Sequence, residues 1–544
     1  MMGKMPVPPV RVADRVAETL FAHGVRHAFG MPGGEVVTLI DGLQRAGIGF
    51  CLSRHETAAA IMAAGASVLL DQPQVLVTTV GPGLANAVNG IADAAQERVP
   101  LIVLSGIVDR ETRARYTHQV IDHAALLRPL VKASFEIEPE SAAATVTRAI
   151  RLALTEPKGP VHLDLSPSVA AAPALDAKSL VPAAVLLPEV SERDPLIANL
   201  IERIEQAERP LVIAGFEAAR SGCSTDLLSL AETIGAPVIT TYKGKGLVPE
   251  DHPLALGGAG LSPKADRLLL PLIRQADLVL ALGYDPIEMR IGWMDIVDDP
   301  STWIDVTALP ADHAMHHAGL RIPVAPSAIL RTLTSHLPRK NSWPEQEFHA
   351  VRQQLRQMFS GGDRWGPRAI VDVLQDAAEP NAIVTVDSGA HRILLSQQWI
   401  CRKPLTLLQS AGFCTMAAAL PLAIGAKLAR PETPVFAVMG DGGLEMGIGE
   451  LATLRDLGLP VTIVLFQDES LALIALKQAS AGLPPLGVSL GQTDFAAVAR
   501  GFGGFGVNVE TTDDLRHELA AARERQTVSL ICCRFDASAY NGAF

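Results

Sequence analysis

Short apolar runs rich in β-branched residues alternate with longer alanine-rich stretches along most of the chain, and this alternation limits the fold more than any other feature. In the first third, the apolar runs are His27–Met31, Gln74–Thr79, Pro100–Ser105 and Val161–Leu165. The stretches Glu56–Leu70 and Leu84–Ala95 between them have the length and composition of helices. Strands that are apolar throughout are buried on both faces, which requires helical crossovers. The pattern therefore predicts an α/β fold built on doubly wound parallel sheets.

The same alternation occurs in three successive parts of the 544 residues. The further predicted strands are Pro210–Ala214, Pro237–Thr241, Leu278–Leu282, Ile383–Asp387, Pro434–Met439, Val461–Gln467 and Ser529–Phe535. A stretch rich in proline and alanine, Ser166–Glu189, predicts a linker, and the polar helical segment Asn341–Asp363 predicts a second connector. We therefore expect three domains, at residues 1–180, 190–340 and 360–544.

Composition excludes several classes of protein. The chain has 58 acidic and 46 basic residues, a net charge of −12, and no block of lysine or arginine, which argues against a nucleic-acid partner. Its six cysteines form no CxxC pair and no small disulfide framework, which predicts a reducing cytoplasm. The first residues contain no continuous apolar segment, so we expect no signal peptide.

Two uncharged runs are long enough to cross a membrane, Gln72–Ala92 and Pro404–Ala426. The first is interrupted by Gly81-Pro82-Gly83, and the second contains polar residues and Pro421. Lysine-rich flanking loops are also missing. We expect each run to contain a buried helix and a site loop, and we expect no membrane partner.

Two polar segments predict a metal site. The first, Gly440-Asp441-Gly442-Gly443, follows an apolar strand and opens a helix, where glycines let backbone N–H groups approach an anion. Asp468 ends the next strand, 27 positions after Asp441. An Asp-Gly turn alone is common in loops. Two oxygen ligands at the ends of neighbouring strands, however, predict Mg²⁺ or Ca²⁺ bridging a diphosphate.

This pair of segments resembles the thiamine-diphosphate-binding motif of the acetolactate synthase, pyruvate oxidase and 2-oxo acid decarboxylase superfamily. The resemblance implies that the side chains of Asp441 and Asp468 and the carbonyl of Ser470 hold Mg²⁺. The family usually ends the motif with two asparagines, whereas this chain has Gln467-Asp468. An aspartate keeps an oxygen ligand and adds a negative charge.

The N-terminal third is similar to the same family. Ser53-Arg54-His55-Glu56 resembles the family's RHE segment, in which the glutamate bonds the aminopyrimidine ring of the cofactor. That chemistry needs a carboxyl, because proton exchange with the ring generates the imino tautomer that removes the thiazolium C2 proton. A glutamate that opens an alanine-rich helix is also explained by the helix dipole. Two glycine-rich loops resemble the family's FGxPGG and GPGxxN loops, and the residues they contribute are Gly33, Gly81 and Asn86.

The C-terminal third supplies the other cofactor contacts that the resemblance implies. The diphosphate contacts are Ser388, Gly389, His391, Gly440, Gly442 and Gly443. Ala390 stands where the family more often has glutamine. In a GxGTM-like segment, Met416 would lie under the cofactor and force its bent shape, and Cys414, at a glycine position, would contact the cofactor through its carbonyl. Without the surrounding match, Met416 reads equally as a core methionine.

The substrate positions depart from acetolactate synthases. Where that branch has a Gln-Trp pair after the metal loop, this chain has Leu476-Lys477, and Ala472 replaces the loop glycine. Lys477 predicts a pairing with an anionic substrate group, or else a solvated helix lysine. Gln119 falls where the family has a glutamine that faces the substrate, and His118 is a candidate proton shuttle.

The resemblance implies an enzyme that adds the cofactor's C2 ylid to a 2-oxo acid, releases CO₂ and leaves an enamine. Our first prediction is acetolactate-type ligation. The alternatives are a non-ligating decarboxylase, a 2-hydroxyacyl-CoA lyase (Lys132-Ala133-Ser134-Phe135 weakly resembles that branch) and a catalytically silent cofactor-binding paralogue. A NAD-dependent Rossmann enzyme is disfavoured, because no GxGxxG opens a βαβ unit with an acidic residue about 20 positions later.

The resemblance also bears on assembly and on a second cofactor. It implies a homodimer or homotetramer with the active site at the subunit interface. Some members bind FAD in the central domain. The glycine cluster after the first central strand, Ala214-Gly215-Phe216-Glu217, is thin, so FAD is not favoured.

Overall fold

A computed structural model describes residues 10–176, 190–191, 193–310, 313–343, 347–361 and 364–543. The first nine residues, on which the signal-peptide expectation rests, lie outside the described residues, as does much of the predicted linker. Within Ser166–Glu189, residues Pro167–Ala171 form a short helix, α8, so the linker prediction was wrong there. Pro167 stands at the first helical position, where a missing N–H costs nothing. No helix among the described residues is long and apolar enough to cross a membrane.

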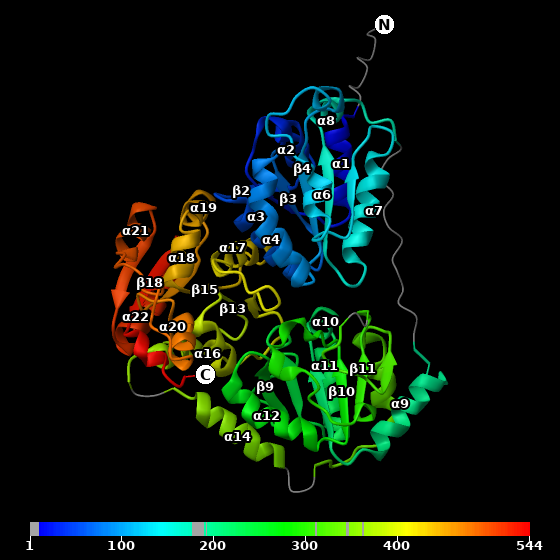
Figure 1. The fold of residues 1–544 in the computed structure, drawn as a ribbon, viewed down its shortest axis with the longest axis vertical. Coiled ribbons are helices and arrows are strands. Elements are labelled where there is room, and N and C mark those ends of the chain that lie inside the picture. Colours follow the sequence, from blue (N-terminus) through cyan, green and yellow to red (C-terminus); the bar gives the residue numbers. More distant parts are fainter. Residues whose placement is uncertain are drawn as a thin grey trace. The chain divides into compact units, whose positions relative to one another are not determined.

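The first of two compact units contains residues 1–185 and 424–429 and is built on a six-stranded parallel sheet of order β2-β1-β3-β4-β6-β5 (Figure 1). The strands are β1 His27–Gly30, β2 Gly49–Leu52, β3 Gln74–Thr78, β4 Leu101–Gly106, β5 Ser134–Glu136 and β6 Pro160–Leu165. The helices are α1 Val12–Ala22, α2 Val37–Arg45, α3 Glu56–Leu70, α4 Pro82–Gln96, α5 Arg110–Arg113, α6 His123–Leu127, α7 Ala142–Leu154 and α8. Helix α1 packs on α2 and α7, whereas α3 packs on α4, so helices cover both faces of the sheet.

The second unit contains two more parallel sheets. The central sheet has the order β12-β11-β10-β7-β8-β9, with β7 Pro210–Ala214, β8 Val238–Thr241, β9 Ala255–Ala259, β10 Leu278–Leu282, β11 Trp303–Val306 and β12 Leu320–Ile322. Its helices are α9 Pro195–Gln206, α10 Phe216–Arg220, α11 Ser224–Ile234, α12 Pro263–Gln275 and α13 Leu330–His336. The predicted connector contains α14, Glu347–Phe359, which packs on α12.

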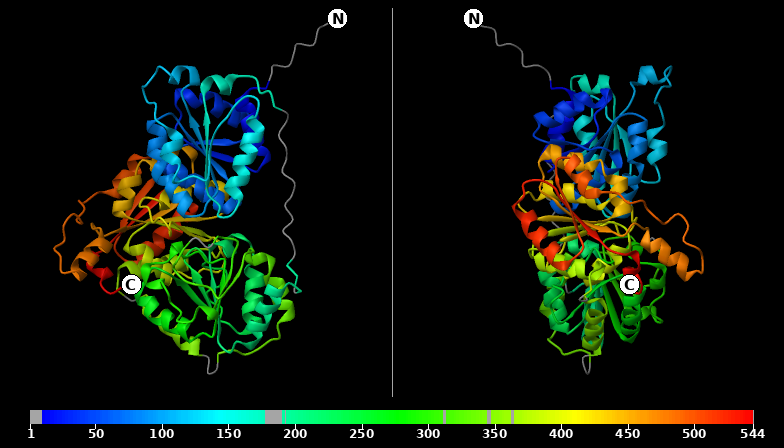
Figure 2. Two further views of the ribbon diagram at one scale, coloured as in Figure 1. Left: turned by 45° about the vertical axis from the view of Figure 1, so that its right-hand side comes forward. Right: turned by 90° about the vertical axis from the view of Figure 1, so that its left-hand side faces the viewer.

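The last sheet has the order β14-β13-β15-β16-β18-β17, and Figure 2 shows its strands in yellow to red. The strands are β13 Ile383–Val386, β14 Leu407–Gln409, β15 Val435–Gly440, β16 Thr462–Gln467, β17 Phe505–Val509 and β18 Ser529–Arg534. The helices are α15 Pro367–Ala377, α16 Ala390–Gln398, α17 Ala419–Ala429, α18 Asp441–Gly447, α19 Glu450–Leu457, α20 Ala472–Ser480, α21 Phe495–Gly501 and α22 Thr512–Glu524. The α/β prediction with doubly wound parallel sheets is confirmed.

Each sheet reverses its direction of winding at one point. The reversal lies between β1 and β3 in the first sheet, between β7 and β10 in the central sheet, and between β13 and β15 in the last. At such a point the two following crossovers leave in opposite directions, and a crevice opens at the carboxyl ends of the strands, where ligands of open α/β sheets bind. The sheet order therefore nominates three places to examine for a site.

The crevice of the central sheet is closed by the backbone. Gly215 follows β7, and a Cβ atom there would lie 2.3 Å from the carbonyl oxygen of Gly283, which follows β10. A Cβ on Gly283 would in turn lie 2.6 Å from the backbone nitrogen of Ala218. The turns after β7 and β10 therefore pack directly on each other. The first and last sheets remain as candidates.

Candidate cofactor site

The crevice of the last sheet contains a cavity of about 380 Å³. Loops after β13, β15 and β16 line it, together with helix α20 and Tyr540. The predicted residues that line this cavity are Ser388, Gly389, His391, Cys414, Met416, Gly440, Asp441, Gly442, Gly443, Asp468, Ser470 and Lys477. All the cofactor and metal residues predicted from the C-terminal third therefore lie around one cavity.

Two carboxylates lie at the carboxyl ends of neighbouring strands. Oδ2 of Asp441 accepts the backbone N–H groups of Asp468, at 3.1 Å, and of Glu469, at 2.6 Å. Oδ1 of Asp468 accepts the N–H of Ser470 at 3.0 Å. Burial, and then the charge of Asp441, raise the pKa of Asp468 to about 7. Asp441 is buried and Asp468 is half-buried, and two carboxylates facing one cavity are the donor set that a hard divalent cation neutralises, so these residues fit Mg²⁺.

His391 suits an anion at the other side of the cavity. Its ring is buried, and burial together with the nearby Arg392 lowers its pKa to about 3. Its Nε2 atom is buried and has no hydrogen-bond partner in the structure. The ring also bonds the backbone of Asp387, so Nε2 is its one unengaged nitrogen, and it fits a diphosphate oxygen once it carries a proton. The glycines at 389 and 440 keep room for it, because a Cβ on either would lie 2.6 or 3.2 Å from its Cε1 atom.

Two groups that were not predicted as site residues support the loops of the cavity, namely Asp387 behind its lining and Arg392 in it. Asp387 is fully buried and accepts the N–H groups of Ala417 and Ala418, at 3.1 and 3.0 Å, so it holds the loop that carries Met416. Arg392 donates to the carbonyl of Ser410 and to Sγ of Cys414. In the sequence, the segment Asp-Ser-Gly-Ala-His-Arg that follows β13 is the only feature that could have pointed to Asp387 or Arg392.

Cys414 adopts a left-handed backbone, with φ of 60°, which accounts for the glycine found at this position in the family motif. Its carbonyl accepts the hydroxyl of Ser388 at 2.8 Å, and its thiol donates to the carbonyl of Ala411 at 3.1 Å. Both groups are thus engaged in fixing the loop, although the carbonyl keeps a second lone pair.

The tight packing of this loop gives a first testable prediction. A Cβ on Gly443 would lie 1.9 Å from Oδ2 of Asp387, whose position is fixed by two backbone donors. We expect Gly443→Ala to lower the free energy of unfolding by roughly 1–3 kcal/mol and to displace the Met416 loop. Gly442→Ala is the matched control, because its Cβ would meet only the ends of Leu471 and Leu490, at 3.1 and 3.3 Å. Urea denaturation of both variants measures the difference, and equal stabilities would contradict this packing.

The buried imidazole gives a second prediction, for the protein without ligands. Because the pKa of His391 is 6.5 in the unfolded chain and about 3 in the fold, its contribution to stability is complete above about pH 6.5. That contribution is lost as the pH falls toward 3. We therefore expect the unfolding free energy of His391→Gln to fall less between these pH values than that of the wild type. The exposed His517→Gln serves as control, and parallel curves for all three proteins would refute the prediction.

In the first unit, Glu56 is the first residue of α3 and is buried. Its Oε2 accepts Nδ2 of Asn86, on α4, at 3.2 Å, and the hydroxyl of Thr57 donates to the carbonyl of Asn86 at 2.6 Å. The two helices approach closely at Gly90, where a Cβ would lie 2.6 Å from Cβ of Ala60. Two residues that the sequence predicted on separate motifs are therefore brought into direct contact.

The loops at the crevice of the first sheet also meet. Thr79 donates to Glu35 at 2.6 Å, and a Cβ on Gly33 would lie 2.3 Å from the Thr79 hydroxyl. Gly81 has φ of 48°, and Gln119 also has a left-handed backbone, with φ of 58°. The side chains of His118 and Gln119 are exposed in this chain.

The helix dipole alone does not explain Glu56. A glutamate that only stabilises the start of a helix need not be buried against Asn86.

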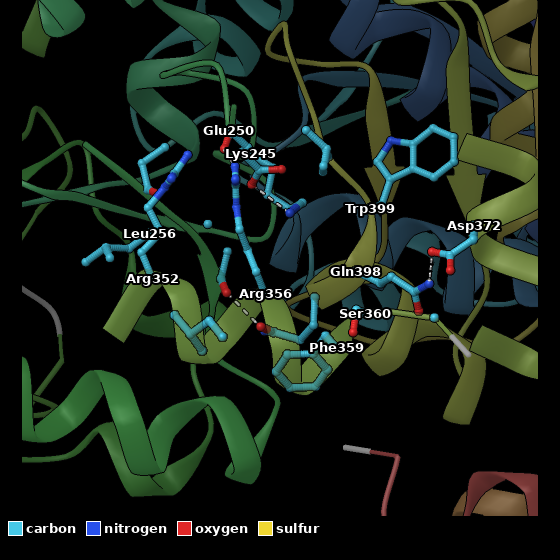
Figure 3. Close-up of a pocket in the computed structure, with 17 residues that line it drawn as sticks. Lys245, Glu250, Leu256, Arg352, Arg356, Phe359, Ser360, Asp372, Gln398 and Trp399 are labelled. Atoms are coloured by element: carbon cyan, nitrogen blue, oxygen red, sulfur yellow. Dashed lines mark hydrogen bonds and ion pairs between the residues drawn. The ribbon is translucent and has the colours of Figure 1, made fainter. Parts of the chain in front are cut away.

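A second cavity in the second unit, of about 330 Å³, lies between β9, α14 and the end of α16 (Figure 3). Its charged groups are already engaged within the protein. Lys245 pairs with Glu250 at 2.6 Å, and Arg352 donates to the carbonyls of Asp251, His252 and Ala255. This cavity thus offers no convergent set of donors for a charged ligand.

Comparisons with known proteins agree with the site. Residues 10–126, 197–333 and 387–533 match, in turn, the N-terminal TPP binding domain, the central domain and the C-terminal TPP binding domain of thiamine pyrophosphate enzymes. The chain is 32% identical over 517 residues to an acetolactate synthase of Bacillus subtilis, covering 93% of this chain and 90% of the relative. It is also 32% identical over 531 residues to a probable acetolactate synthase large subunit of Methanocaldococcus jannaschii, covering 94% and 89%.

A solved structure gives an independent comparison of the fold. The thiamine diphosphate-dependent 4-hydroxybenzoylformate decarboxylase of Rhodococcus jostii RHA1 superposes with a TM-score of 0.81 at 23% identity, covering 97% of this chain and 99% of that one. At this identity the likeness supports the three-sheet architecture and not a substrate.

Proposed function

The chain belongs to the thiamine pyrophosphate enzymes, and we propose that it is an active, Mg²⁺-dependent member that forms or cleaves a C–C bond of a 2-oxo acid. The observation that carries this proposal is the cavity of the last sheet, where the buried Asp441, the half-buried Asp468 and the unpartnered Nε2 of His391 face one space. Acetolactate-type ligation is the reaction we favour, because the relatives named above are acetolactate synthases.

Thiamine diphosphate, when bound, would supply a nucleophilic carbon for the 2-oxo carbonyl. Its ring would supply the acceptor for the electron pair left by departing CO₂. In this chain, Asp441 and Asp468 would hold Mg²⁺ with the Ser470 carbonyl, and the glycine amides at 440 and 443 would donate to the diphosphate. Gly442, whose N–H donates to Asp441, would line the space for the diphosphate. His391 would bond the diphosphate through Nε2, and Met416 would support the bent cofactor. Cys414 and Ser388 would keep the loop in place.

Glu56 would hold a proton at its carboxyl and exchange it with the aminopyrimidine ring. Its hydrogen bond from Asn86 fixes the direction of that carboxyl, which matters because proton transfer needs heavy atoms about 3 Å apart. Gly33 and Gly81 would let their loops approach the ring. Gln119 and His118 would face the 2-oxo acid.

Lys477 supports a second candidate reaction. It lines the cavity from α20, next to Leu476, at positions where acetolactate synthases have a Gln-Trp pair. A lysine there would pair with an anionic group on the substrate, so simple decarboxylation of an acidic 2-oxo acid is the alternative. A 2-hydroxyacyl-CoA lyase has less support, because Lys132 donates to the carbonyls of Thr155 and Pro157 and thus holds the chain itself.

We further propose a homodimer or homotetramer whose active site forms between subunits, and a cytoplasmic location. The domain boundaries at residues 1–180, 190–340 and 360–544 stay predictions. We do not favour FAD, because the glycine cluster after β7, Ala214-Gly215-Phe216-Glu217, is thin.

A panel of 2-oxo acids, assayed for CO₂ release with thiamine diphosphate and Mg²⁺, tests the proposal. We expect release from at least one acid, and loss of release when Mg²⁺ is chelated. Cofactor binding without release from any acid would instead leave the catalytically silent paralogue and the 2-hydroxyacyl-CoA lyase, and only the lyase would exchange the C2 proton of the bound cofactor.

A further inference from the structure

A buried group of two histidines and one aspartate lies in the first unit, outside every predicted cofactor contact. His123 opens α6, and His162 and Asp164 lie on β6; their exposed fractions are 3%, 0% and 8%. Nδ1 of His123 lies 2.7 Å from Oδ1 of Asp164, and Nε2 of His162 lies 3.3 Å from the same oxygen. No motif or spacing in the sequence connects these three residues.

The neighbours of His123 determine which of its nitrogens carries the proton. The backbone N–H of Gly81 points to its Nε2 at 3.4 Å, so Nε2 must offer a lone pair. Nδ1 therefore carries the proton and donates it to Asp164. Burial alone would raise the pKa of Asp164, but the hydrogen bond from His123 and the nearby ring of His162 outweigh it and hold that pKa below its usual value. A metal ion at Nδ1 would need the lone pair that this arrangement does not provide.

The segment from Gln119 to His123 contacts Gly81 at a second point. A Cβ on Gly81 would lie 2.3 Å from the carbonyl oxygen of Gln119, so that carbonyl packs directly on the glycine. The left-handed backbone of Gln119 is unfavourable for a residue with a side chain and persists only where the surroundings hold it. The segment from Gln119 to His123 thus meets Gly81 at both ends, and Asp164 fixes the His123 end.

We infer that His123, oriented by Asp164, is a positioning residue that clamps Gln119 against the Gly81 turn and so presents Gln119 to the 2-oxo acid. His123 is itself buried and acts only through Gly81 and Gln119. The inference rests on the proposed function, which assigns Gln119 to the substrate.

Three variants test the clamp. His123→Leu removes both hydrogen bonds, whereas His123→Gln keeps an amide that can donate and accept. His162→Gln is the matched control. His162 is equally buried and contacts Asp164, but among the described residues it makes no hydrogen bond to Gly81. With the active 2-oxo acid, we expect His123→Leu to raise KM about tenfold while kcat and thiamine diphosphate affinity change little. We expect His123→Gln to restore most of the loss.

Hydrogen exchange followed by mass spectrometry provides a readout that does not depend on activity. Peptides covering residues 79–86 and 117–127 should exchange faster in His123→Leu than in the wild type and in His162→Gln. Equal exchange would overturn the clamp, and faster exchange without a change in KM would overturn its link to the substrate. One equivalent of bound Zn²⁺, lost in His123→Leu, would replace the clamp by a metal site. A wild type inactive on all 2-oxo acids would refute the proposed function, whereas the exchange data would still decide the clamp.

Discussion

Glu56→Gln should slow C2-proton exchange of bound thiamine diphosphate by about 10²–10⁴-fold, the usual contribution of a positioned acid–base group. The amide keeps the size of the side chain and can still meet Asn86, so we expect the cofactor affinity to change little. The effect is large because Glu56 is the buried carboxyl of the first unit to which Asn86 donates, and an amide cannot exchange a proton with the ring.

The exchange is measured by acid quenching in D₂O and proton NMR of the released cofactor. Glu140→Gln, at an exposed position of the same unit, is the control and should behave as the wild type. An unchanged exchange rate in Glu56→Gln would leave Glu56 with only a helix-terminal role.

Asp441→Asn should weaken Mg²⁺-dependent cofactor binding by about 10²–10³-fold. The carboxylate accepts three backbone N–H groups, from Gly442, Asp468 and Glu469, which orient it between the two strand ends. An asparagine turns one acceptor into a donor that opposes those N–H groups, and it removes the charge that attracts the cation. Breaking a buried charged hydrogen-bond network of this kind typically costs about 3–5 kcal/mol.

Asp468→Asn is the matched comparison, and we expect it to keep Mg²⁺ binding within about tenfold of the wild type. The amide still offers an oxygen ligand. The change also removes a negative charge that burial and the charge of Asp441 both disfavour. Calorimetric titration of thiamine diphosphate at several Mg²⁺ concentrations separates the two variants. Equal losses in both variants would mean that the metal needs the negative charge of both carboxylates. No loss in Asp441→Asn would mean that Asp441 is not a metal ligand.

Most central strands of the three sheets could be predicted from the sequence, because a strand buried on both faces is usually a continuous apolar run. The exception is β11, Trp303–Val306, which is buried throughout but contains Asp305. Strands β7 and β10 were predicted with their observed bounds. Most of the missed strands lie at the edges of the sheets, namely β2, β5, β9, β12, β14 and β17. Strand β2, Gly49–Leu52, is exposed at its first and last residues, and β12, Leu320–Ile322, has three residues. Short, half-exposed strands give no apolar run, since their position depends on the neighbouring strand.

The candidate site could be predicted where a motif is local. Asp441, Asp468 and His391 each follow a strand, and the reversal between β13 and β15 brings their loops to one cavity. Tyr540 could not be predicted, because it reaches the same cavity from the last residues of the chain. The His123, His162 and Asp164 cluster joins a loop to β6 across about 40 positions, and no spacing rule links a buried histidine to an aspartate at that separation.

The labelling pattern of the product tests the central claim most directly. With thiamine diphosphate, Mg²⁺ and [2-¹³C]pyruvate, acetolactate-type ligation joins two labelled carbons, so the product should show a direct ¹³C–¹³C coupling and one CO₂ should appear for two molecules of pyruvate consumed. The coupling should vanish in Glu56→Gln. A product with a single uncoupled label would establish simple decarboxylation in place of ligation. No turnover of pyruvate or of any other 2-oxo acid would contradict the proposed enzyme.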